Sequence, residues 1–185
     1  MKSILKTCFL FFVIFVVLCG VIYPFLITGL AQALFPFQSN GSMIQKDGKV
    51  IGSKLLGQNF TSEKYFQGRS CTTEVSGGSN LGPTNQSWLN EVVERIKKFK
   101  DINHISDNQI IPSDLVTNSA SGLDPHISKD SAYLQISRVA KTRNVAPDTI
   151  KQIVDQEVKK DSIPFFSEER VNVLQLNMKL DEQIK

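Results

Sequence analysis

A polar loop in the second half of the chain holds the side chains best suited to chemistry, Ser119, Ser121, Asp124 and His126. A serine nucleophile needs a base within hydrogen-bond reach and an acid behind that base, so these residue types match a hydrolase. The members of such a triad normally come from separate elements, and the Gly-x-Ser-x-Gly turn is missing. A turn with Gly122 at a positive φ explains the run better. We therefore expect no catalytic residues, with a membrane-tethered hydrolase using Ser121, Asp124 and His126 as the alternative.

A second candidate site is the run Ser76, Gly77, Gly78, Ser79 and Asn80. Neighbouring glycines can turn several backbone N–H groups toward one anion, as in phosphate-binding loops. The run lacks the Lys-Ser or Lys-Thr ending and the spacing of such a loop. On these residues alone it predicts a turn, and a nucleotide contact is the alternative.

The other reactive side chains predict neither a metal centre nor a disulfide within the soluble part. That part has one cysteine, Cys71, and two distant histidines, His104 and His126, which cannot complete a zinc site. From Lys46 onward the chain has 19 basic and 18 acidic residues, a net charge of +1, so we expect no nucleic-acid partner.

The chain that positions these side chains has two parts of very different composition, an uncharged N-terminal stretch and a charged remainder. Residues 7–45 contain no Asp, Glu, Lys, Arg or His. A helix over residues 7–34 would be roughly 40 Å long, enough to cross a hydrocarbon core of about 30 Å. We predict a transmembrane helix in contact with lipid, kinked near Pro24. The alternative is a signal peptide cleaved near Ala33, which would release a secreted binding domain.

The charges that flank the apolar run predict its orientation. Lys2 and Lys6 lie directly before it, whereas the first charges after it begin at Lys46. Because positive charge is retained on the cytoplasmic side, we expect residues 1–6 in the cytoplasm and residues 35–185 as an extracytoplasmic domain. The predicted location is the cell membrane, with a single span.

The soluble region predicts a small mixed α/β (α+β) domain. Residues 40–82 indicate loops with short strands, one of them at Val50 and Ile51. A helix should follow, capped by Thr84 or Asn85, with Trp88 as a core anchor. The helix face is completed by Val92, Ile96 and Phe99, with Leu89 and Val93 widening the stripe.

Four further elements are expected beyond that helix. Residues 110–117 predict a short strand broken at Pro112, and residues 128–142 a helix with Ala132, Ile136, Val139 and Ala140 inward. Another helix should begin at Pro147. Residues 171–180 alternate as a strand would, while Ser167 offers a helix cap; we favour a helix on length.

Six segments, in this order, resemble the blocks of a known family. They are residues 52–60 (GSKLLGQNF), 65–70 (YFQGRS), 76–85 (SGGSNLGPTN), 116–128 (VTNSASGLDPHIS), 135–143 and 171–177. Through these segments the chain resembles the C subunit of the Kdp-type potassium-transporting ATPase.

The resemblance implies a non-catalytic accessory subunit of a potassium uptake complex. Its expected partners are the potassium-conducting subunit, the ATP-hydrolysing subunit and a small membrane subunit. The resemblance also implies a chaperone role that raises the affinity of the catalytic subunit for ATP, with residues 76–80 as a suggested nucleotide contact. The expected orientation keeps that turn away from cytoplasmic ATP, so we expect ATP and potassium to act through the complex. For partner contacts we favour Ser119, Ser121, Asp124 and His126.

Overall fold

A computed structural model describes residues 2–69, 76–160 and 168–184. Ser70, Cys71 and Ser167, on which parts of the sequence analysis depend, lie outside these ranges. The chain divides into two compact units, Met1–Ile51 and Gly52–Lys185, and each is described by itself.

The first unit is dominated by one apolar helix. It consists of α1 (Lys2–Val17), a π-helical turn η1 (Leu18–Ile22) and α2 (Tyr23–Leu34). Together they form a 33-residue candidate membrane span, in which an 18-residue stretch has a mean hydropathy of 2.9. The helix ends at Leu34 as predicted, but it begins before residue 7. The π turn lies directly before Pro24, where Tyr23 N–H donates to Leu18 O across five residues. A wider turn relieves the clash between a proline ring and the preceding carbonyls.

A short helix and a hairpin follow the apolar helix. They are α3 (Pro36–Ser39), β1 (Met43–Lys46) and β2 (Lys49–Ser53), and β1 pairs with β2. The connecting residues Asp47 and Gly48 have φ of 52° and 75°, the left-handed pair that a two-residue hairpin turn requires. The short strand expected at Val50 and Ile51 is confirmed.

The second unit begins its helices with α4 (Gln86–Asn103), which Asn85 caps by accepting a hydrogen bond from Trp88 N–H at 3.2 Å. The prediction of the cap is therefore confirmed. The prediction that Trp88 anchors the core is wrong, because Trp88 is only partly buried and lies outside the core cluster. Val93 is 64% exposed and Leu89 38%, so they do not widen the buried stripe. The core is reached by the last turns of α4, through Phe99.

The strand predicted over residues 110–117 is also wrong. Pro112 stands at the N-cap of a one-turn helix, α5 (Ser113–Val116). Proline lacks the N–H that a strand ladder needs but suits the position before a helix, where that N–H would have no partner. Leu115 and Val116 are buried by this turn.

The predicted helix over residues 128–142 is divided in two. Strand β3 (His126–Ser128) leads into α6 (Lys129–Tyr133) and then α7 (Ile136–Arg143). Ser128 caps α6 by accepting from Ser131 N–H at 3.2 Å. The four residues expected to face inward are buried: Ala132, Ile136, Val139 and Ala140.

The C-terminal elements combine both alternatives left open by the sequence. Helix α8 (Pro147–Glu157) begins at the proline as predicted. Strand β4 (Arg170–Asn172) then leads into α9 (Val173–Gln183), so residues 171–180 are a strand end followed by a helix. Asn172 joins the two by accepting from Gln175 N–H at 3.1 Å.

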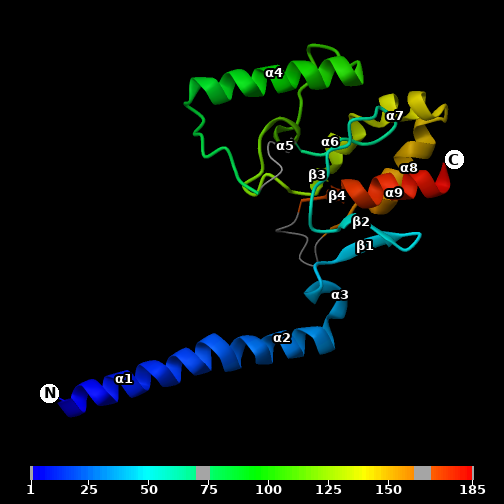
Figure 1. Cartoon of the computed structure of the whole chain (residues 1–185). Helices are drawn as coiled ribbons and strands as arrows, with labels where there is room; N and C mark the ends of the chain where they lie inside the picture. The colour runs from blue at the N-terminus through cyan, green and yellow to red at the C-terminus, as the bar shows by residue number, and fades with distance from the viewer. Residues whose placement is uncertain (1, 70–75, 161–167, 185) are drawn as a thin grey trace. The chain divides into compact units, whose positions relative to one another are not determined.

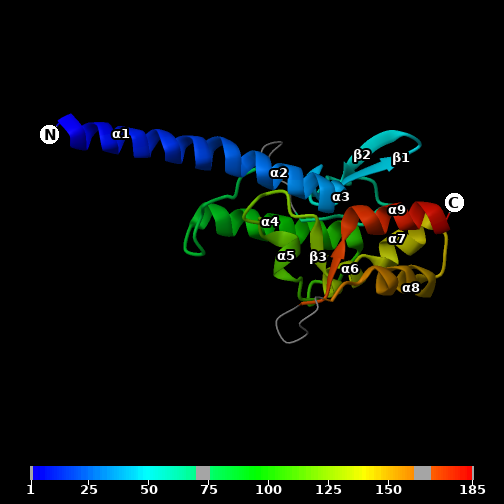
Figure 2. The same cartoon turned by 90° about the horizontal axis from the view of Figure 1, so that it is seen from below.

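Strands β3 and β4 pair antiparallel, with Ile127 opposite Val171. Helices α7 and α9 both pack on α8, and α9 runs alongside it in both views (Figures 1 and 2). Ile127, Val139, Ile150, Val154 and Leu176 are among the side chains that fill the core between these elements. Over the residues described, the second unit is thus mostly helical with the small β3–β4 sheet, which agrees with the predicted α/β class.

An irregular segment with a turn at residues 62–65 reaches this core through Phe66. We call residues 58–69 the clamped segment, because side-chain amides take the place of a strand partner. Asn177 accepts from Phe66 N–H at 2.8 Å and donates to Phe66 O at 2.9 Å. Gln135 does the same for Gln67, at 2.8 and 3.0 Å. Arg69, at the end of the clamped segment, is thereby held beside the polar loop.

Candidate functional site

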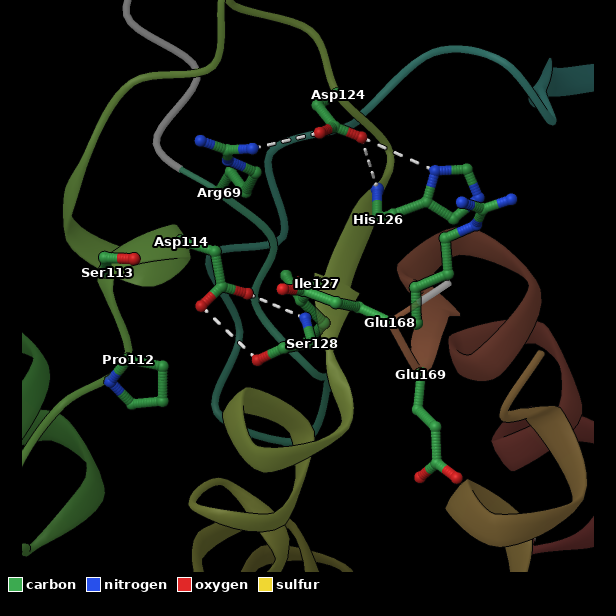
Figure 3. A pocket seen from close by; sticks show the side chains of 11 residues that line it. Arg69, Pro112, Ser113, Asp114, Asp124, His126, Ile127, Ser128, Glu168 and Glu169 are labelled. Atoms are coloured by element: carbon green, nitrogen blue, oxygen red, sulfur yellow. Dashed lines mark hydrogen bonds and ion pairs between the residues drawn. The ribbon is translucent and has the colours of Figure 1, made fainter. Parts of the chain in front are cut away.

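The polar loop, residues 119–126, is organised around the carboxylate of Asp124. Arg69 Nη1 donates to Asp124 Oδ2 at 3.0 Å, and His126 N–H donates to Asp124 Oδ1 at 3.0 Å. The imidazole Nδ1 of His126 lies 3.5 Å from the same oxygen, so Asp124 stands between Arg69 and His126 (Figure 3). Both side chains of the Arg69–Asp124 pair are less than one-third exposed. A partly buried charged hydrogen bond orients the loop more firmly than a surface pair would.

A second carboxylate, Asp114, fixes the other side of the site. Asp114 Oδ2 accepts from Ser128 N–H at 2.7 Å, and Oδ1 accepts from Ser131 Oγ–H at 2.7 Å. Asp114 belongs to α5 and Ser131 to α6, so this contact ties the helix after Pro112 to α6. Figure 3 shows the contact of Asp114 with Ser128, the cap of α6.

An open hollow of about 460 Å³ separates the two carboxylates from the start of β4. Of the predicted contact residues, Asp124 and His126 line it, while Ser119 and Ser121 do not. Arg69, Asp114, Glu169 and other residues complete the lining.

The two serines serve the loop backbone. Ser121 Oγ accepts from Leu123 N–H at 3.2 Å, and Ser119 Oγ accepts from Asp124 N–H at 3.4 Å. Within the described ranges, no hydrogen bond joins either hydroxyl to His126. The nucleophile–base contact that a serine hydrolase needs is therefore not formed.

The glycine-rich turn packs directly on the polar loop. Gly77 N–H and the Ser76 hydroxyl both donate to Ser121 O, at 2.8 and 3.0 Å. A Cβ atom on Gly78 would lie 2.9 Å from Ala120 O, and one on Gly122 would lie 2.5 Å from Gly77 O. Gly122 also has φ of +70°, as its place in the turn predicts. The two candidate sites are therefore one structure, in which the Gly77 amide is already hydrogen-bonded.

Burial and nearby charge set the protonation of two groups at the hollow. Burial is the main cause that lowers the pKa of His126, and Asp124 opposes it, so the neutral imidazole is favoured. Hydrogen bonds from Lys129 and Lys160 lower the pKa of Glu169 to about 2. At neutral pH the hollow thus holds an ionised Glu169 and a neutral His126.

Two residues of the site were missed by sequence reasoning. Arg69 lies in one of the family-like blocks, but its partner is 55 positions away and no spacing rule connects them. Asp114 was placed in a predicted strand. Across the described residues there is no cluster of three His, Cys, Asp or Glu side chains that could hold a metal ion.

The chain thus joins a candidate membrane span to a small domain whose polar site consists of turns and ion pairs. Comparison with known proteins identifies the family. The family model described as "K+-transporting ATPase, c chain" matches residues 5–182. The chain belongs to this family, which makes it a non-catalytic subunit of a potassium-transporting ATPase complex and confirms the resemblance seen in the sequence.

Full-length relatives agree. The potassium-transporting ATPase KdpC subunit of Geotalea uraniireducens is 46% identical over 190 residues, covering 98% of each chain. The subunit of the same name from Caldanaerobacter subterraneus subsp. tengcongensis is 44% identical, over 95% of this chain and 93% of the relative. That from Dechloromonas aromatica is 44% identical over the whole of both chains.

Proposed function

We propose that this chain stabilises the assembly of a high-affinity, ATP-driven potassium uptake complex. The observation that carries the proposal is the family match over residues 5–182. Its partners would be the potassium-conducting subunit, the ATP-hydrolysing subunit and a small membrane subunit.

The polar loop is the contact that we propose for these partners. Its backbone is fixed from three sides, by Arg69, by the Gly77 amide and by Gly57, whose N–H donates to Leu123 O at 2.7 Å. A loop pinned in this way presents Asp124 and His126 without losing much conformational entropy on binding. Ser119 and Ser121 would then contribute by shaping the loop.

The orientation is part of the proposal. Residues 1–6 would be cytoplasmic, residues 7–34 would span the cell membrane, and residues 35–185 would form the extracytoplasmic domain. The charges of Lys2 and Lys6 before an uncharged stretch support this direction. Labelling of an Asp107→Cys variant in intact cells by a membrane-impermeant thiol reagent tests it, and labelling only after lysis contradicts it.

We further propose that any effect on ATP affinity is transmitted through assembly. The extracytoplasmic placement separates residues 76–80 from ATP, and the hydrogen bond of Gly77 to Ser121 O gives the turn a structural task. Photolabelling of the chain by an azido-ATP in the intact complex would contradict this and favour a nucleotide contact at Ser76, Gly77, Gly78, Ser79 and Asn80.

Deletion of the gene tests the function as a whole. Cells lacking this chain should fail to grow at limiting potassium and should yield no purified complex. Unchanged growth would contradict the proposal. A His126→Ala variant that retains growth would remove the remaining argument for the hydrolase.

A further inference from the structure

A second hollow on the domain differs from the first in its charge. It has a volume of about 390 Å³ and lies between the clamped segment and α4. Three cationic side chains line it: Arg69, Arg95 and Lys98. Among the residues that the structure describes, no carboxylate lines it. We call this hollow the basic pocket.

Two of the three cations are held in place from outside the basic pocket. Asp124 binds Arg69 at 3.0 Å, and Glu91 binds Arg95 at 2.9 Å. Arg95 Nη1 also donates to Val116 O at 3.2 Å, so its guanidinium is anchored to the end of α5. These partners compensate the two guanidinium charges and fix their positions.

Lys98 supplies the charge that remains. It is exposed on α4, and within the described ranges its ammonium group makes no hydrogen bond or ion pair. The neighbouring Lys97 is also exposed but does not line the basic pocket. The uncompensated positive charge at this hollow therefore comes from Lys98 and not from its neighbour Lys97.

The rest of the lining suits a protein side chain. Phe60, Phe99 and Leu115 give an apolar wall, and the side chain of Asn59 adds a polar group. The volume lies in the range of pockets that bury small ligands. The ammonium group of Lys98 can pair with a carboxylate, and the apolar wall suits the carbon atoms of a Glu or Asp side chain and its neighbours.

We propose that the basic pocket binds an acidic segment of another subunit of the ATPase, with a carboxylate beside Lys98. This rests on the proposed function, since it names a second contact for the same assembly. Charge complementarity and the presence of partner subunits favour a protein occupant. Anionic lipid is the alternative that the experiment must separate.

The test uses competition inside cells. Tagged full-length wild-type chain is coexpressed with an untagged full-length Lys98→Glu chain and the other subunits, and the complex is purified through another subunit. The ratio of the two chains in the complex is compared with their ratio in the membrane by mass spectrometry. Since like charges repel across an interface, Lys98→Glu should be depleted about tenfold or more.

The matched control is Lys97→Glu, which makes the same charge change one position away on the same helix. It should be incorporated within about twofold of wild type, because rim charges contribute little. Thermal melting of both variants, monitored by circular dichroism, should match wild type. Restoration of Lys98→Glu incorporation by an acid-to-lysine substitution in a partner subunit would identify the occupant.

Equal incorporation of the Lys98 and Lys97 variants would overturn the proposal. So would normal incorporation of Lys98→Glu together with a selective loss of binding to vesicles containing anionic phospholipid, since that makes the pocket a lipid site. If the wild-type chain itself does not copurify with the other subunits, the proposed function fails, and the basic pocket loses its partner with it.

Discussion

The clamped segment and the polar loop are both irregular backbone, yet they are held by different forces. The clamped segment is fixed by the neutral amides of Gln135 and Asn177, both almost completely buried. The polar loop is fixed at the surface by the charge of Asp124 and by close backbone contacts at Gly122. Buried backbone N–H and C=O groups have no access to water, so each must be hydrogen-bonded within the protein. Groups of a surface loop can instead remain available to another subunit.

The buried Arg138 extends this contrast. Its guanidinium donates to Asn103 Oδ1 at 2.8 Å, to Gln135 Oε1 at 2.9 Å and to Glu63 O. Burial lowers its pKa, but the acceptors are placed to satisfy the charge. In the core, polar groups serve the fold; at the loop, charge is presented outward. Four variants can test this division, from the largest expected loss of stability to the smallest.

Removal of a clamp should cost most. Asn177→Leu deprives the buried Phe66 of partners for both its N–H and its C=O, so the free energy of unfolding should fall by about 3 kcal/mol. Chemical denaturation of the full chain in detergent measures this. Asn90→Leu, on the exposed face of α4, is the control and should stay within about 0.5 kcal/mol of wild type. A loss below about 1 kcal/mol for Asn177→Leu would show that the amide is no clamp.

Rigidity of the polar loop should matter next. Gly122→Ala places a Cβ atom 2.5 Å from Gly77 O at φ of +70°, and should cost about 2 kcal/mol. Because this separates the glycine-rich turn from the loop, incorporation into the ATPase complex should fall as well. Gly82→Ala, with no atom within 4 Å of the added Cβ, is the matched control. Equal effects of the two variants would contradict the close packing.

Loss of the ion pair between Arg69 and Asp124 should affect the stability of the chain and the assembly of the complex to different extents. Asp124→Asn keeps the shape but weakens the bond to Arg69, which should cost about 1 kcal/mol of stability. If the loop contacts a partner, yield of the complex should fall far more than stability does. Asp107→Asn, at an exposed turn, should change neither. A normal yield for Asp124→Asn would remove Asp124 from the proposed interface.

The smallest effect should come from His126 and should appear only on acidification. Because burial lowers its pKa in the folded state, the unfolded chain takes up the proton first as pH falls below about 6.5. Stability contributed by the neutral imidazole should therefore be full near pH 7.5 and decline toward pH 5.5. Denaturation midpoints at both pH values should show a larger loss for wild type than for His126→Gln. An equal loss would mean that other groups titrate.

Local signals account for what could be predicted of the fold. The apolar helix, the Asn85 cap of α4 and the start of α8 at Pro147 depend on composition or on neighbours within one turn. The predictions for residues 110–117 and for Trp88 were wrong because the local pattern there was compatible with more than one structure. Pro112 is compatible with a strand edge or a helix start, and only the burial of Leu115 decided between them. Trp88 matched a helical stripe, but it lies outside the core cluster, which α4 meets through Val92, Ile96 and Phe99.

The sequence by itself determined the family, the apolar helix and the identity of the polar loop, because each is carried by contiguous residues. Tertiary structure alone decided how the loop is held. It brought Arg69 to Asp124 and the Gly77 amide to Ser121 O, contacts that span 55 and 44 positions. It also left Lys98, rather than Lys97, facing the basic pocket. The physical reason is that an ion pair or a buried amide needs its partner within about 3 Å. When the partner is distant in the sequence, packing of the core decides whether the two groups meet, and local propensities do not.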